Sequence, residues 1–136
     1  MKHDEFIGQV QARARLGSRG DAERVTRATL ETLGERLAGG EAKDLASQLP
    51  REIGRHLLTY HSEKGKRMTL DEFFEKVSER EEEDLPKAVF HARAVISVLQ
   101  EAVTPGELED VRSQLGPEFE PLFESGAEGE LRRDRD

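Results

Sequence analysis

The side chains with the broadest chemistry in this sequence are its four histidines, His3, His56, His61 and His91. Their spacing matches no standard metal-binding motif. Aligning the two halves of the chain at an offset of 66 residues places His56 opposite Leu122, and it places His91 opposite Val25. Each of these two histidines thus occupies a position that is apolar in the other repeat. The imidazole there is a ligand for a metal or small molecule, or a proton switch near neutral pH, or else a partly buried, hydrogen-bonded ring at the core edge. We treat both residues as candidates for a ligand site.

A second candidate is the sequence Asp-x-x-Ser-Gln-Leu, which occurs at residues 44–49 and again at residues 110–115. Serine and glutamine just before a Pro or Gly turn can satisfy the carbonyls that a helix end leaves open. Alternatively, two equivalent sets of polar side chains could line a cleft between two repeats and bind a small molecule. The candidate residues are Asp44, Gln48, Asp110 and Gln114.

Several classes of chemistry are not expected. The chain has no cysteine, which excludes disulfides, thiolate metal sites and cysteine nucleophiles. It also lacks the G-x-S-x-G elbow, the P-loop, the H-E-x-x-H zinc motif and a Rossmann glycine pattern. We therefore predict no enzymatic activity, no catalytic residue, no cofactor and no resident metal.

The net charge and the hydropathy of the chain argue against two classes of partner, nucleic acids and membranes. The 136 residues carry 21 basic and 29 acidic side chains, which gives a net charge of -8. A negative net charge does not favour binding to the phosphate backbone of a nucleic acid. No apolar run approaches the roughly 18 residues of a membrane span, and residues 1–10 do not resemble a secretory signal. The expectation is a cytoplasmic protein that binds neither nucleic acid nor membrane, and whose partner is another protein or a second copy in a homo-oligomer.

Charge is also divided unequally along the chain. Residues 1–67 carry 13 basic and 10 acidic side chains, whereas residues 68–136 carry 8 and 19. Residues 79–84 alone hold five acids, and the matching junction of the first half, residues 13–27, is rich in arginine. Such polarity can steer a partner or let two copies meet head to tail, and it is also typical of ordinary solvated surfaces. The two junctions and the second helix of each half are the expected contact surfaces.

These residues must be positioned by a duplicated set of helices. Residues 40–53 and 106–119 are identical at seven aligned positions, 66 residues apart. Upstream, apolar residues match on one helical period at the same offset, and residues 4–10 match residues 71–77 at an offset of 67. The sequence therefore predicts two tandem repeats of three to four helices each.

Local signals place the helix ends. Apolar residues at 70, 73, 74 and 77 follow the spacing of an amphipathic helix, and Thr69 with Glu72 forms a capping box at its start. A longer helix is expected from about residue 84 to 103. Thr104 with Glu107 predicts a second capping box, and Gly39-Gly40 predicts a left-handed stop in the first repeat.

No segment alternates with the period of a strand, so the predicted fold is all-α. A repeat of about 60 residues buries too little surface to be stable alone. We therefore predict one compact helical domain over residues 1–125, with the repeats packed about a pseudo-twofold axis. Repeat one spans 1–59, a connector spans 60–67 and repeat two spans 68–125, while residues 126–136 are expected to form a charged, disordered tail.

Three segments carry a resemblance to a known family: the opening Asp4-Glu5-Phe6, residues 28–50 (ATLETLGERLAGGEAKDLASQLP) and residues 106–119 (GELEDVRSQLGPEF). Together they resemble the bacterial and archaeal domain-of-unknown-function family 2267, over the chain up to about Phe123. The resemblance implies an all-helical tandem-repeat protein, and it brings no reaction, ligand or catalytic residue. The functional prediction is a non-enzymatic cytoplasmic helical module that acts by protein-protein interaction or self-association. The alternative is a small-ligand or metal-binding domain that uses a cleft between the repeats.

Overall fold

A computed structural model of the protein describes residues 1–124, so the predicted tail lies outside the described residues. The elements in chain order are α1 His3–Arg13, α2 Arg19–Arg36, α3 Gly39–Ser47, α4 Arg51–Gly54, the 3-10 helix η1 Arg55–Leu58, α5 Leu70–Glu81, α6 Leu85–Ala102, α7 Pro105–Leu115 and the 3-10 helix η2 Pro117–Phe123. Within this part of the chain there is no strand, only an isolated bridge between Ala38 and Ser62. The predicted all-α fold is confirmed. None of the helices over residues 1–124 has the length and apolar character needed to cross a membrane.

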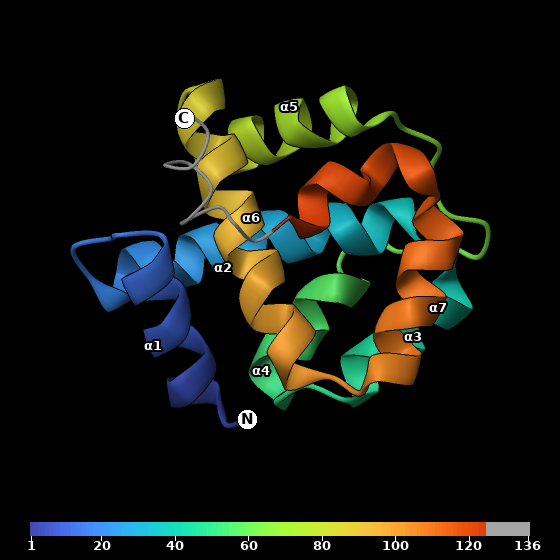
Figure 1. Ribbon diagram of the computed structural model, residues 1–136, viewed down its shortest axis with the longest axis horizontal. Helices are drawn as coiled ribbons and strands as arrows, with labels where there is room; N and C mark the ends of the chain where they lie inside the picture. The colour runs from blue at the N-terminus through green and yellow to red at the C-terminus, as the bar shows by residue number, and fades with distance from the viewer. Residues whose placement is uncertain (125–136) are drawn as a thin grey trace.

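The helices are gathered around α2, which crosses the middle of the molecule (Figure 1). Helices α1, α5 and α6 and the 3-10 helix η1 all pack against it. Helix α6 also packs against α1 and α5, and helices α3 and α7 lie side by side at one end of the molecule. Elements from the two halves of the sequence are therefore in contact along most of the fold.

Helix α2 is the most enclosed element. Every residue from Ala28 to Gly34 is buried, including Thr29, Glu31 and Thr32. Helix α6 is also largely buried, with Val95, Ile96 and Leu99 in the same core. Burial restricts the contact surface expected on the second helix of each repeat to the first half of α2, where Glu23 and Arg27 are exposed, and to the two ends of α6.

The helix starts follow the polar residues that precede them. Thr69 and Glu72 form the predicted capping box of α5, with the Thr69 Oγ1 accepting from the Glu72 amide at 3.1 Å and the Glu72 carboxylate accepting from the Thr69 amide at 2.9 Å. Ser18 and Asp84 cap α2 and α6 in the same way with their side-chain oxygens. These caps fix where each long helix begins.

The link between α2 and α3 differs from the prediction. Gly39 and Gly40 open α3 instead of ending α2 with a left-handed residue, and Leu37 is the residue that ends α2. Gly39 is needed because a Cβ there would lie 2.8 Å from the Ser62 carbonyl oxygen. The connector passes at this point, and the Gly39 amide donates to the Glu63 carbonyl at 3.1 Å. The glycine is thus explained by close backbone approach.

Candidate functional site

The candidate site lies where α3 and α7 meet. At this point the backbone N–H of each helix's N-cap residue donates a hydrogen bond to a side chain of the other helix. Gln48, at the end of α3, accepts a hydrogen bond from the Thr104 amide at 2.8 Å through its Oε1. Gln114, near the end of α7, accepts one from the Ala38 amide at 2.6 Å. Thr104 and Ala38 are the N-cap residues of α7 and α3. Both candidate glutamines therefore connect a helix of one half of the chain to a helix of the other half.

This exchange corrects the predicted capping box at Thr104. The Thr104 hydroxyl does accept from the Glu107 amide at 3.2 Å, but the Thr104 amide is bonded to Gln48 and not to the Glu107 carboxylate. Glu41 occupies the same third position of α3, and the Ala38 amide is bonded to Gln114. In both helices a glutamine from the other helix takes the bond that the glutamate makes in a capping box. The carboxyl groups of Glu41 and Glu107 therefore do not bind the N-cap amides of their own helices.

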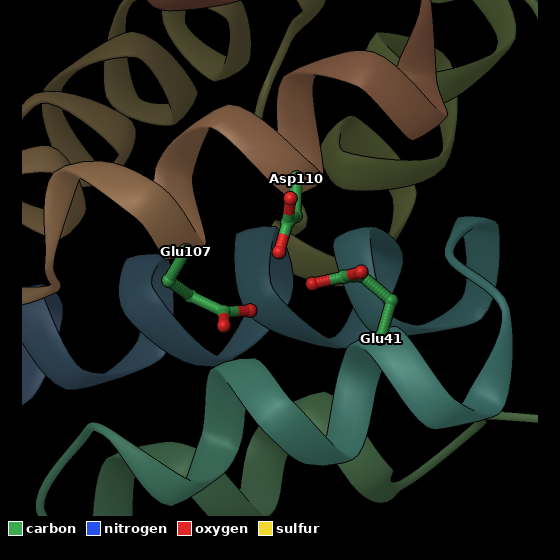
Figure 2. Close-up of side chains that lie close together, drawn as sticks. All are labelled: Glu41, Glu107 and Asp110. Carbon is green, nitrogen blue, oxygen red and sulfur yellow. The ribbon is translucent and has the colours of Figure 1, made fainter.

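The two glutamates turn toward each other and toward Asp110. One carboxylate oxygen from each of Glu41, Glu107 and Asp110 lies within 4.8 Å of the others, and Figure 2 shows the three side chains converging from the facing helices. We call these three residues the carboxylate cluster. The Oε2 atoms of Glu41 and Glu107 are buried and receive no hydrogen bond from the described protein. If all three carboxyl groups were ionised, no hydrogen bond from the described protein to these two oxygen atoms would offset their mutual repulsion.

The surroundings favour a proton on the cluster. Burial, a hydrogen bond to Glu107 and the negative charges of Glu107, Asp110 and Asp44 raise the pKa of Glu41 from 4.5 to about 7. A protonated Glu41 can donate to the Glu107 carboxylate, which neutralises one of two adjacent charges. Near neutral pH the pair thus holds and releases a proton.

A hard cation fits these residues less well. Calcium takes about six to eight oxygen ligands and Mg²⁺ requires a near-octahedral set. The described residues bring only three carboxylates together here. The same geometry therefore suits a shared proton better than a dedicated cation site.

Asp44, the remaining acid of the repeated motif, is exposed and lies outside the cluster. Its charge acts on Glu41 from the same helix. The Ser47 hydroxyl donates to the Asp44 carbonyl at 2.6 Å near the end of α3. This bond is of the kind expected from the structural interpretation of the motif, in which the serine satisfies a terminal carbonyl.

The candidate histidines lie elsewhere. The His91 Nδ1 is 2.9 Å from the Glu81 Oε2, in a pair between α6 and α5 that leaves the histidine 7% exposed and Glu81 fully buried. His56, in η1, is half-buried, and its pKa is lowered by burial and then by the positive charges of Arg55 and Arg27. Neither histidine belongs to a group of three potential metal ligands within residues 1–124.

Most charges of the two junctions are engaged inside the molecule. In the basic junction Arg13 donates to Glu101 at 2.8 Å, and the Arg15 guanidinium lies over the Phe90 ring. In the acidic junction Glu81 is paired with His91, and the Asp84 side chain caps α6. Of the acidic junction, the exposed Glu79 and Glu82 form no ion pair within residues 1–124. The pairings leave little of the basic junction for a head-to-tail contact between copies.

Sequence reasoning identified Asp110, Gln48 and Gln114 but missed Glu41 and Glu107 as a pair. The available signal was their identity at an offset of 66, since both stand at the third position of a helix. A glutamate at that position normally predicts a capping box. Only the structure shows that Gln48 and Gln114 bind the two N-cap amides, so that neither glutamate completes a capping box.

We predict that Gln48→Ala and Gln114→Ala each lower the free energy of unfolding by about 0.5–2 kcal/mol, as expected when a helix N-cap loses its hydrogen-bond partner. Urea unfolding followed by circular dichroism measures the loss. Gln9→Ala is the matched control, because Gln9 is exposed and bonds only Arg13 one turn away; we expect less than about 0.5 kcal/mol there. Equal losses in all three variants would contradict the role of the two cross-helix bonds.

Comparison with known proteins identifies a family for this chain. No curated protein matches the chain in sequence. One protein family, described as an uncharacterized conserved protein family (DUF2267), matches residues 3–122. The match spans nearly all of the described residues, and the chain therefore belongs to the DUF2267 family.

Proposed function

We propose that this protein is a non-enzymatic, cytoplasmic helical module that acts by binding a basic segment of another protein on the outer face of α5. That face carries Asp71, Glu75, Glu79 and Glu82, which we call the acidic face. The observation that carries the proposal is that all four side chains are exposed and share one side of α5 and its C-cap. The opposite side of the helix holds the buried Phe73, Phe74 and Val77.

The spacing of the acidic face is costly to the helix. Asp71, Glu75 and Glu79 follow one another at intervals of four residues, and like charges at that spacing destabilise a helix. None of the four acids forms an ion pair with a basic side chain within residues 1–124. A basic partner would supply the missing compensation, and complementary charge would also speed the encounter.

The character of the remaining surface supports recognition by charge. Among the described residues, the large apolar side chains that are exposed are Met1, Tyr60 and Leu85, at 40%, 49% and 43%. Met1 precedes α1, Tyr60 follows η1 and Leu85 is the first residue of α6. Three such side chains are too few for a large apolar interface. Binding at the acidic face should therefore weaken as salt is added.

Another protein is favoured over a second copy as the partner. In a homo-oligomer the acidic face would have to meet basic residues of the same chain. Arg13, Arg19 and Arg24 of the basic junction are already paired with acids within their own molecule. We therefore expect a monomer mass in light scattering at both low and high salt.

A pseudo-twofold relation between the two repeats is part of the proposal. It is supported by the exchange of glutamine bonds, because Gln48 and Gln114, and likewise Ala38 and Thr104, are 66 residues apart. It is also supported by the crossed packing of α1 on α6 and of α5 on α2. Under this relation the acidic face of repeat two has α1 as its counterpart in repeat one.

The alternative is a small-ligand or metal-binding domain that uses the junction between the repeats. The carboxylate cluster lies there, and this is the observation that favours it. The alternative is the weaker one because three carboxylates, one of them prone to hold a proton, leave a hard cation short of ligands. A rise in melting temperature with Mg²⁺ or Ca²⁺ would support it.

The docking proposal predicts that Glu75→Lys/Glu79→Lys weakens binding of a fluorescent lysine-rich peptide by roughly tenfold or more, since attraction is replaced by repulsion at the centre of the face. Fluorescence anisotropy at low salt measures the affinity. The control, Glu52→Lys/Glu63→Lys, makes the same change in net charge at two exposed acids of the first half. If both double variants weaken binding equally, the peptide senses only net charge and the acidic face has no special role.

A further inference from the structure

The junction of α3 and α7 contains a second set of contacts besides the two glutamine bonds. Glu41 and Glu107 approach each other from the first turns of the two helices, and one carboxylate oxygen of each lies within 4.8 Å of the other. A hydrogen bond between two carboxyl groups requires a proton on one of them. A single proton shared at this point would therefore replace two facing negative charges by a hydrogen-bonded pair.

We propose that Glu41 and Glu107 form a proton-operated latch, which holds α3 against α7 while the two carboxyl groups share one proton and loosens when that proton is lost. This inference is independent of the docking face on α5. It concerns how firmly the two halves of the chain are joined.

The groups that act on Glu41 are acidic on both sides. Asp44 acts from α3, and Glu107 and Asp110 act from α7. The basic residues of the neighbouring elements are engaged or face solvent: Arg36 of α2 donates to the Leu115 carbonyl at 3.4 Å, and Arg112 of α7 is paired with Glu120. Lys43 of α3, Arg51 of α4 and Arg55 of η1 are exposed.

Loss of the proton turns an attraction into a repulsion. With Glu41 ionised, two carboxylates with buried oxygen atoms would face each other and Asp110. The N-termini of α3 and α7 favour negative charge nearby. Burial and the acidic neighbours act in the opposite direction and raise the pKa of Glu41 to about 7.

The latch and the glutamine bonds share the same two helices. If α3 and α7 separate, the Thr104 amide loses Gln48 and the Ala38 amide loses Gln114. Hydrogen exchange at these two amides therefore reports the state of the latch. A carboxyl whose folded pKa lies above its unfolded value stabilises the fold at low pH, and here the stabilisation is lost as the pH rises through about 7.

The test compares the full chain with Glu41→Gln, in which a neutral amide can still donate to Glu107 whatever the pH. Between pH 5 and pH 8 we expect the melting temperature of the wild-type protein to fall by several degrees relative to Glu41→Gln. Over the same range the protection factors of the Ala38 and Thr104 amides should fall in the wild-type protein and remain constant in the variant. The Leu99 amide, in the core of α6, serves as the reference for global unfolding.

Glu109→Gln is the matched control, because Glu109 is an exposed acid of α7 outside the cluster. It should keep the wild-type dependence on pH. Glu107→Gln should weaken this dependence without abolishing it, because burial, the largest cause of the raised pKa of Glu41, remains; it provides a second variant if the first folds poorly. The latch is refuted if the wild-type protein and both cluster variants respond to pH in parallel, or if the two amides keep full protection at pH 8.

Discussion

Gly34→Ala is expected to prevent stable folding, with a loss of about 4 kcal/mol or more in the free energy of unfolding. A Cβ at Gly34 would lie 1.9 Å from the Leu57 carbonyl oxygen and 2.6 Å from its carbon. Both atoms belong to the backbone of η1, which packs on α2 at this point, so no side-chain rotation can relieve the clash. The helix pair would have to move apart within a close-packed core.

Thermal and urea unfolding followed by circular dichroism measure this loss. Gly8→Ala is the control, because Gly8 also lies within a helix and a Cβ there meets no atom within 4 Å. Alanine normally stabilises a helix interior by about 0.5–1 kcal/mol relative to glycine. The two substitutions should therefore have opposite signs. Equal stabilisation by both would show that η1 does not lie against Gly34 as described.

His91→Leu is expected to cost about 3–5 kcal/mol, because it leaves a fully buried carboxylate without its partner. Glu81 is 0% exposed, and its Oε2 lies 2.9 Å from the His91 Nδ1. The other oxygen, Oε1, is buried and already has no hydrogen bond. Removing the imidazole would therefore leave both oxygens of Glu81 unsatisfied.

The double variant Glu81→Met/His91→Leu separates the pair from general packing. Replacing both partners of a buried polar pair by apolar residues of similar size is often neutral or stabilising, so the double variant should recover most of the loss. Urea unfolding of the wild-type protein and of the single and double variants closes a double-mutant cycle. Losses that simply add would contradict the interaction between Glu81 and His91.

Helical periodicity and capping residues were sufficient for most of the fold. The stripe at 70, 73, 74 and 77 and the Thr69–Glu72 capping box predicted α5, and both are present. The expected helix over residues 84–103 is α6, Leu85–Ala102. These features depend on neighbours within one or two turns of the same helix, which is why a sequence alone could reveal them.

Features that depend on packing between distant segments were not predictable. Gly39 was predicted to end a helix. The structure shows instead that the connector passes so close to this residue that a side chain would not fit. Polar residues such as Thr29, Glu31 and Thr32 gave no sign that α2 would be enclosed on all sides. In both cases the decisive neighbour is remote in sequence.

The site was predictable only in part for the same reason. Duplication singled out the motif that contains Gln48 and Gln114, but not which atoms these side chains would bind. Their bonds to the opposite helices are what release Glu41 and Glu107 from capping and bring the two acids together. The sequence left His91 open as either a functional group or a hydrogen-bonded ring at the core edge. Its partner Glu81 was hidden among five acids in six residues that resembled a solvated helix end.

The most direct test of the latch is an NMR pH titration of the Glu41 side-chain carboxyl carbon in the full-length protein, with Glu109 as internal reference. Because the two carboxyl groups of the pair are coupled, the midpoint belongs to the pair with Glu107. The latch predicts a midpoint near pH 7 at Glu41, accompanied by a change at Glu107. A Glu41 midpoint near 4.5, the ordinary value for a glutamate, would contradict it.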